Sequence, residues 1–152
     1  MREPKPFIEL DPARVTASAR RAASIRGSAG AGRPIGLESM RRLDLVVCAS
    51  VAVNRRGARI GKGGGYADVE LGLATDAGLV GGDTVIVTTV HPLQILDAEL
   101  PETRHDFRVD LLVTHDEVIR CRKARRAPGI IWDHLTSEKI EAIPALAARR
   151  TS

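Results

Sequence analysis

Apolar residues gather in short runs in the middle of the chain, and these runs predict the strands of one sheet. The longest covers residues 43–53 (LDLVVCASVAV), a near-continuous β-branched run of the kind found in strands buried on both faces of a parallel sheet. Residues 83–90 (DTVIVTTV) and 107–114 (FRVDLLVT) predict two further strands. Residues 116–120 predict a short fourth one.

A helix predicted between the first two strands determines the fold class. Over residues 66–79, Val69, Leu73 and Ala77 are spaced i, i+4 and i+8, and the glycines that follow provide a stop. Strand, glycine-rich loop, helix and strand in this order form a βαβ pattern. The sequence therefore predicts an α/β fold with a mainly parallel sheet and flanking helices.

The two ends of the chain carry weaker helical signals. Asp11 and Pro12 form a helix start, and the small, polar stretch 26–36 (RGSAGAGRPIG) is expected to end that helix as a loop. A short helix is predicted over residues 136–143. We therefore expect an α/β domain over residues 1–126 and a C-terminal helical extension over residues 127–152.

Composition narrows the class of protein only slightly. The 152 residues suffice for one domain with a single core. Aromatic residues are few, whereas a domain that stacks bases on aromatic platforms is expected to carry more. The formal charge of +4 suits nucleic acid, but it equally suits an enzyme whose substrates carry phosphates and carboxylates.

Other features predict the cellular setting. Cys48 and Cys121 show no metal or redox spacing, so we expect a reducing compartment. No apolar stretch approaches the roughly 18 residues needed to span a bilayer. The N-terminal segment lacks the apolar core of a signal peptide. We expect a cytoplasmic protein without a membrane partner.

The strongest candidate site is the glycine-rich loop between the first strand and the helix. Successive glycines let backbone N–H groups converge on an anion, and the N-terminus of the following helix adds its positive dipole. The pattern predicts a phosphate-binding loop, and the alternative is a glycine-rich hairpin turn without a ligand. The glycines and basic residues of the segment are Gly57, Gly61, Gly63, Gly64, Gly65, Arg55, Arg56, Arg59 and Lys62.

Spacing excludes two familiar phosphate motifs. Walker A requires G-x-x-x-x-G-K followed by Ser or Thr, but Gly57 and Gly61 are too close and Lys62 precedes Gly63. A dinucleotide fingerprint requires G-x-G-x-x-G, and Tyr66 occupies its last position.

Residues 57–68 (GARIGKGGGYAD) resemble the ATP-binding loop of the 5-formyltetrahydrofolate cyclo-ligase (methenyltetrahydrofolate synthetase) family, whose pattern is roughly G-x-R-L-G-x-G-x-G-Y-Y-D. The resemblance is strongest over residues 43–120 and includes HDFRVDLLVT at 105–114. The YAD variant and the C-terminal APGIIWDHL are similar to the divergent methenyltetrahydrofolate synthetase domain-containing group. The positions that match the loop pattern are Arg59, Gly61, Gly63, Gly65, Tyr66 and Asp68.

The resemblance implies a protein that uses ATP and Mg²⁺ to convert 5-formyltetrahydrofolate, a reduced formyl-folate, into 5,10-methenyltetrahydrofolate. It implies that Asp68 and Asp106 hold Mg²⁺ and that Arg59, Lys62 and Tyr66 take part in catalysis. The residues that it implies for ATP binding are Arg59, Gly61, Lys62, Gly63, Gly64 and Gly65.

Each of these residues also has a structural alternative. Asp68 can cap the helix, and Asp106 can belong to a turn. Tyr66 can pack at the base of the loop. Arg59 and Lys62 can be solvated loop charges.

Two departures from the family pattern keep other functions open. Ala67 replaces the second tyrosine, and nothing before Leu43 matches the family's N-terminal lysine and glutamate, so we expect that part of the family domain to be absent. One alternative is a divergent paralogue with another formyl-amide substrate or no catalysis. Another is a basic RNA-binding or interaction module that uses residues 120–126 (RCRKARR), a run that otherwise forms a solvated connector. Self-association is a further possibility, because another chain can complete an incomplete sheet.

Overall fold

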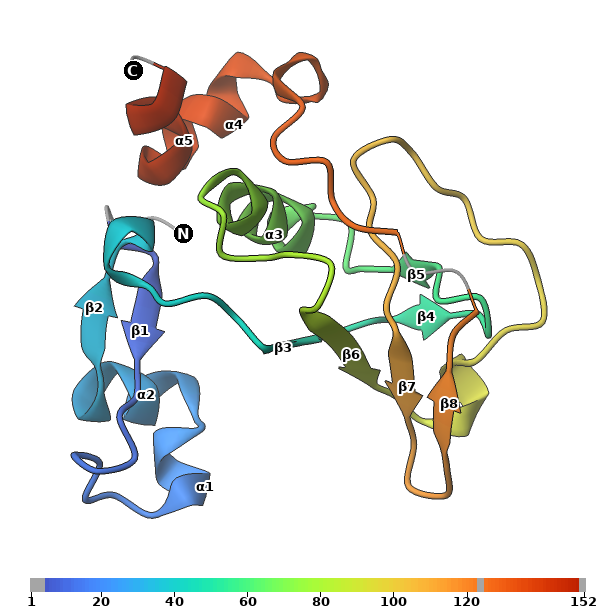
Figure 1. Ribbon diagram of the computed structural model, residues 1–152, viewed down its shortest axis with the longest axis horizontal. Helices are drawn as coiled ribbons and strands as arrows, with labels where there is room; N and C mark the ends of the chain where they lie inside the picture. Colours follow the sequence, from blue (N-terminus) through green and yellow to red (C-terminus); the bar gives the residue numbers. More distant parts are fainter. Residues whose placement is uncertain (1–4, 123–124, 151–152) are drawn as a thin grey trace. The chain divides into compact units, whose positions relative to one another are not determined.

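The computed structural model describes residues 5–122 and 125–150 (Figure 1). The chain forms two compact units, one of residues 41–134 and one of residues 1–40 with 135–152. This division differs from the predicted boundary between residues 126 and 127, and the predicted domain organisation stays a prediction. None of the described helices is both long and apolar enough to cross a membrane.

The unit of residues 41–134 is built on a four-stranded sheet in the order β3-β6-β7-β8. The strands are β3 (Leu45–Cys48), β6 (Val85–Thr89), β7 (Leu111–Val113) and β8 (Val118–Arg120). The first three are parallel, and β8 is antiparallel to β7. Helix α3 (Tyr66–Asp76) connects β3 to β6, which confirms the predicted α/β fold with a mainly parallel sheet.

The predicted strand over residues 43–53 is two strands. After β3 the chain turns into β4 (Ala52–Val53), which pairs antiparallel with β5 (Arg59–Ile60) in a separate hairpin. The Asn54 side chain closes the hairpin, because its Oδ1 accepts hydrogen bonds of 3.1 Å from the backbone N–H groups of Arg56 and Ala58.

Only one face of β3 is buried, so the expectation of burial on both faces was wrong. Val46 and Cys48 are half-buried, but Leu45 is 56% and Val47 62% exposed. The reason is that β3 lies at the edge of the sheet. The fully buried apolar residues lie on the central strands and nearby segments, for example Ile86, Leu112, Phe107 and Val109.

Helix α3 contributes the predicted apolar positions Val69 and Leu73 to the core. The helix ends at Asp76, and Gly78 follows in the left-handed conformation at φ +71°. The segment before and including η3 (Trp132–His134) lies against α3: the Asp76 carboxylate accepts a 3.1 Å hydrogen bond from Ile130 N. A Cβ at Gly72 would lie 2.9 Å from Ile130 Cδ1 and 3.0 Å from the Gly129 carbonyl oxygen, so glycine allows this close packing.

The other unit contains a small antiparallel sheet of β1 (Phe7–Glu9) and β2 (Arg33–Ile35). The expected loop over residues 26–36 was wrong: most of it belongs to α2 (Ile25–Ala31) and β2. Ser24 caps α2, since its side chain accepts from Gly27 N at 3.0 Å. The remaining elements of the unit are α1 (Ala19–Ala22), η1 (Leu37–Ser39), α4 (Ser137–Ala142), which agrees with the predicted helix, and α5 (Pro144–Arg150).

Candidate functional site

The glycine-rich segment consists of two parts with different roles. Gly57 belongs to the β4–β5 hairpin, with φ +87°, and a side chain there would meet the Val109 carbonyl oxygen at 2.3 Å. The fold therefore requires a glycine at position 57. The second part, Gly61–Gly65, links β5 to the N-terminus of α3. There the hairpin alternative does not apply, because the hairpin ends at Ile60.

The loop before α3 is open on one side. Gly63 and Gly65 have φ of +85° and +61°, and a Cβ added at Gly63 would meet no atom within 4 Å. Gly65 is the N-cap of α3 and supplies no side chain to cap it. Lys62 is exposed, and Tyr66 is 56% exposed with its ring beside Gly64. This arrangement leaves room for an anion at the positive end of an eleven-residue helix.

Arg59 is a buried residue rather than a solvated loop charge. Its side chain is 3% exposed, and its Nη2 donates to Asp68 Oδ1 at 2.8 Å. The guanidinium carbon lies 4.2 Å from the centre of the Phe107 ring, a cation–π geometry. Arg59 Nε is buried and has no hydrogen-bond partner among the described residues.

Asp68 lies in the first turn of α3 and is only 18% exposed. Its Oδ1 accepts from Arg59, and its side chain makes no cap hydrogen bond. The Asp68 Oδ2 atom has no hydrogen-bond partner among the residues that the structure describes. Asp68 therefore does not act as a cap of α3, and its Oδ2 atom remains for a ligand.

Asp106 occupies a turn. Its Oδ2 accepts hydrogen bonds from the backbone N–H of Thr103 and, at 2.9 Å, from the Thr103 hydroxyl. His105 Nε2 lies 3.7 Å from its Oδ1. Among the residues with described positions, no three His, Cys, Asp or Glu side chains form a group able to hold a metal ion. The structure thus joins Asp68 to Arg59 and Arg59 to Phe107, the residue after Asp106, but forms no complete metal site.

Phe107 is the residue at this site that sequence reasoning missed. It was assigned only to a strand, although it directly follows Asp106 and is one of two phenylalanines in the chain. It is 1% exposed and forms the surface on which the Arg59 guanidinium lies.

Neither cysteine has the properties of a nucleophile. Burial raises the pKa of the Cys48 thiol, an effect that Arg59 opposes and Asp68 reinforces. Burial, with the Asp110 charge, raises the pKa of Cys121 to about 11. Both thiols are therefore protonated near neutral pH, and both cysteines are free.

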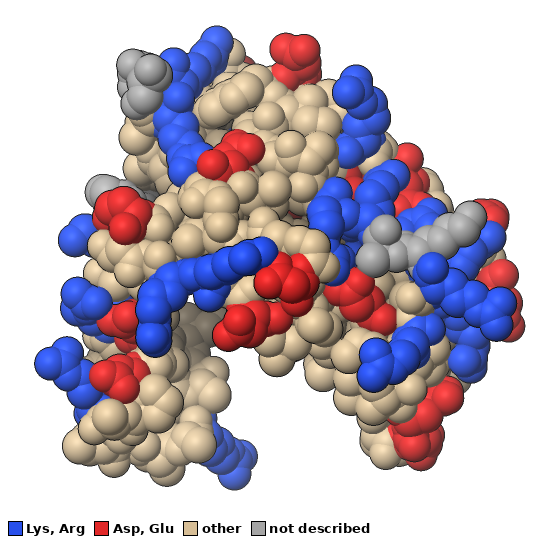
Figure 2. All heavy atoms as spheres, in the orientation of Figure 1, with Lys and Arg blue, Asp and Glu red and all other residues tan. Residues whose placement is uncertain are grey.

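The basic run at 120–126 is partly built into the fold. Arg125 donates to the carbonyl oxygens of Asp106 and Thr103, and Arg126 donates to Asp110 Oδ1 at 3.1 Å. Residues 123 and 124 lie outside the described part. Figure 2 shows basic side chains gathered on the right-hand part of the visible face together with acidic ones, rather than a surface of one sign.

The fold and the loop define an α/β protein in which a glycine-rich segment leads into the helix that joins two parallel strands. A model of the 5-formyltetrahydrofolate cyclo-ligase family matches residues 9–115, and the chain belongs to this family. The match begins well before residue 43, where the strongest resemblance in the sequence starts.

Relatives within the family are vertebrate proteins named methenyltetrahydrofolate synthase domain-containing protein. The chain is 42% identical to the Danio rerio protein over 122 residues, which cover 78% of this chain and 31% of that protein. It is 42% identical to the Homo sapiens protein over 134 residues, or 86% of this chain and 35% of the relative. The Mus musculus protein is 41% identical over 131 residues, 84% of this chain and 35% of its own length. The chain thus spans about a third of each of these relatives.

Proposed function

We propose that this chain is a cyclo-ligase-like protein that binds Mg²⁺·ATP at the loop Gly61–Gly65 and acts on 5-formyltetrahydrofolate to form 5,10-methenyltetrahydrofolate. The observation that carries the proposal is the Arg59–Asp68 pair, buried beside an open glycine loop at the N-terminus of α3. Family membership supports the same function. Two free cysteines support a reducing, cytoplasmic setting as part of this proposal.

The residues present fit the groups that this reaction requires. Mg²⁺ prefers oxygen ligands and usually binds through one or two carboxylates together with phosphates and water. Asp68 Oδ2 is an oxygen of this kind without another partner among the described residues. The open side of Gly63 allows phosphate oxygens to approach the backbone. Bound ATP would supply the phosphoryl group that activates the formyl oxygen.

Each residue of the loop then has a defined task. The backbone N–H groups of Gly63, Gly64 and Gly65 would bind the phosphate oxygens of ATP. Lys62, which is exposed, offsets phosphate charge. Arg59 is a positioning residue: its hydrogen bond holds Oδ1 of Asp68, and Oδ2 would then be the oxygen that binds the metal. Tyr66 would contact the folate, and Asp106, whose Oδ2 accepts from Thr103, would be the second metal-associated carboxylate.

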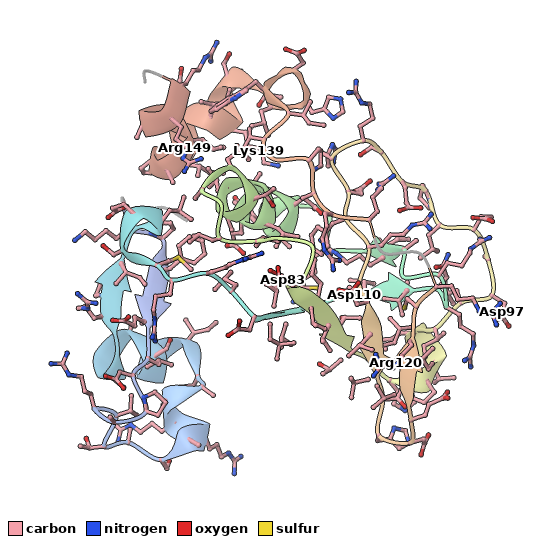
Figure 3. All side chains as sticks on the ribbon, viewed as in Figure 1. Asp83, Asp97, Asp110, Arg120, Lys139 and Arg149 are labelled. Atoms are coloured by element: carbon pink, nitrogen blue, oxygen red, sulfur yellow. The ribbon has the colours of Figure 1, made fainter. Side chains whose placement is uncertain are left out.

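The test is ATP- and Mg²⁺-dependent formation of the methenyl product, followed by absorbance, with ATP binding measured separately by thermal shift. We expect Asp68→Asn to lose turnover and the ATP-induced rise in melting temperature. Asp97→Asn is the matched control, because Asp97 is exposed and has no ion pair or hydrogen bond to a described residue (Figure 3). Turnover that persists in Asp68→Asn would contradict the assignment of the metal site.

Ala67 favours one alternative, a divergent paralogue with another formyl-amide substrate or without catalysis. An alanine there lacks the ring and hydroxyl that the family pattern places before the aspartate. The same experiment separates the two functions, since a paralogue would bind ATP without converting 5-formyltetrahydrofolate. An RNA-binding module is less well supported, because Arg125 and Arg126 already bind groups of the protein itself.

A further inference from the structure

A shallow pocket of about 330 Å³ lies at the carboxyl ends of β6 and β7. Its polar lining comes from Thr89 at the end of β6 and His91 after it, from Gln94 in η2 (Pro92–Gln94), and from Thr114 and His115 after β7. The arrows of β6 and β7 in Figure 1 point in the same direction, toward this end of the sheet. The carboxyl ends of parallel strands are the usual place for ligands in open α/β sheets.

The hydrogen bonds of His91 determine what its ring can offer a ligand. His91 Nδ1 accepts a 3.2 Å hydrogen bond from Leu93 N and so caps η2. A neutral ring with an acceptor at Nδ1 carries its proton at Nε2. Among the described residues, no group accepts a hydrogen bond from that N–H. In this tautomer the ring offers a ligand a hydrogen-bond donor at Nε2.

The rest of the lining is either fixed by the fold or available to the same ligand. Gln94 is fixed, because its Nε2 donates to the carbonyl oxygens of Ser50 and Val51 and its Oε1 accepts from His91 N. The Thr114 hydroxyl is likewise occupied by residues of its own turn. The Thr89 hydroxyl has no partner among the described residues.

His115 closes the pocket on the side of β7. The centres of the His91 and His115 rings are 5.5 Å apart. His115 Nε2 lies 3.1 Å from Asp116 Oδ2, so the Asp116 carboxylate already has a partner. Val90 and Val113 supply apolar surface in the same pocket. The His91 Nε2–H and Thr89 hydroxyl donors lie beside this apolar surface. Together they suit a ligand in which an alkyl chain ends in a group with two acceptor oxygens.

We infer that this pocket binds the carboxylate of a small molecule, with His91 Nε2–H and the Thr89 hydroxyl donating to its oxygens. The site is separate in composition from the glycine loop and does not depend on the proposed cyclo-ligase reaction. The His91 ring is held by the η2 cap, and the backbone of Thr89 is held by strand β6. A carboxylate that accepts both hydrogen bonds forms charge-assisted bonds, which are stronger than neutral ones.

The test is an NMR titration of the full ¹⁵N-labelled chain with glutarate, without ATP or a folate. We expect saturable shifts of the His91 side chain and of the Thr89 and His115 amides. His91→Asn should weaken binding about tenfold, since it removes the Nε2 donor while the Asn side chain can still accept from Leu93 N. Thr89→Val tests the second donor, and His134→Asn, outside the pocket, should bind like the wild type.

Three results would overturn the inference. The first is a glutarate titration that leaves the pocket resonances unchanged, and the second is equal affinity for glutarate in His91→Asn and the wild type. Inorganic phosphate binding as tightly as glutarate would show an anion site without preference for carboxylates. None of these results bears on turnover or ATP binding, so failure here is distinguishable from failure of the proposed function.

Discussion

The two largely buried arginine–aspartate pairs described in the unit of residues 41–134 differ in what holds them. In the first, Arg126 donates to Asp110 and, at 2.9 Å, to the Thr84 carbonyl oxygen. Asp110 Oδ2 also accepts from Ile86 N at 2.8 Å, so this pair connects the starts of β6 and β7 (Figure 3).

The second pair, Arg59 and Asp68, is held by side chains. Arg59 reaches Asp68 through one 2.8 Å hydrogen bond and otherwise lies on the Phe107 ring. The difference shows that residue types alone do not define a role. A pair whose carboxylate oxygens both accept from the protein, one of them from a backbone N–H, supports the fold, whereas a pair with an unused carboxylate oxygen beside an open loop can serve a ligand.

Removing the first pair should have the largest effect on stability. Asp110→Ala leaves the Arg126 charge without its partner and the Ile86 N–H without its acceptor. We expect a loss of about 3 kcal/mol in the free energy of unfolding, measured by urea denaturation. A loss below about 1 kcal/mol would contradict the structural role.

The second pair should combine a smaller loss of stability with a loss of ligand response. Asp68→Asn keeps the size of the side chain but leaves the Arg59 guanidinium without a counter-charge, and we expect about 2 kcal/mol of destabilisation. Thermal unfolding with and without Mg²⁺·ATP measures both effects. Arg126→Lys is a mild change in the first pair, and the ATP-induced rise in melting temperature should remain in this variant. If Arg126→Lys also lost that rise, the two pairs would not differ in their role in ligand binding.

Two glycines extend the same comparison. A side chain at Gly57 would collide with the Val109 carbonyl oxygen, next to Asp110, so Gly57→Ala should cost about 2 kcal/mol or more. Gly63→Ala meets no atom and should cost about 1 kcal/mol from its positive φ alone. Urea denaturation measures which of the two substitutions destabilises the protein more. In a separate titration, Gly63→Ala should bind ATP more weakly than the wild type. Equal destabilisation would contradict the difference in packing.

The smallest effect concerns pH near the first pair. Burial and the Asp110 charge raise the pKa of Cys121 from its ordinary value of 9.0 to about 11. The unfolded chain therefore releases this proton first, and the stability that the neutral thiol contributes is complete below pH 9 and is lost between pH 9 and about 11. Between pH 9 and about 11, the free energy of unfolding should fall by about 1 kcal/mol more in the wild type than in Cys121→Ala. The free energy of unfolding is measured by urea denaturation at each pH. The same pH dependence in the wild type and in Cys121→Ala would contradict this prediction.

Sequence predicted the part of the fold that depends on local pattern. The βαβ order follows from apolar runs and from the spacing of Val69 and Leu73, and the structure confirms it. The division of residues 43–53 into two strands was not predictable, because it depends on the Asn54 side chain and on pairing with β5. Nor was α2, since two of its seven residues are the glycines Gly27 and Gly30, which lower the helix propensity of the segment.

At the candidate site, the sequence identified which residues are present but not the burial and contacts of their side chains. The glycine loop and Asp68 were recognised from their order in the chain. The burial of Arg59 was not, because it depends on Phe107, a residue distant in sequence that reaches Arg59 only in the folded chain. The turn role of Asp106 depends in the same way on Thr103, whose backbone and hydroxyl occupy one carboxylate oxygen.

The uncovered side of β3 affects how the protein behaves in solution. Leu45 and Val47 point away from the buried face of a strand that has no neighbour on its outer side within the described sheet. A strand of this kind is a template for another extended segment, so crowding the chain at high concentration favours edge-to-edge stacking and precipitation. We therefore expect the solubility of the chain to depend on these aliphatic side chains at one margin of the sheet as well as on its net charge of +4.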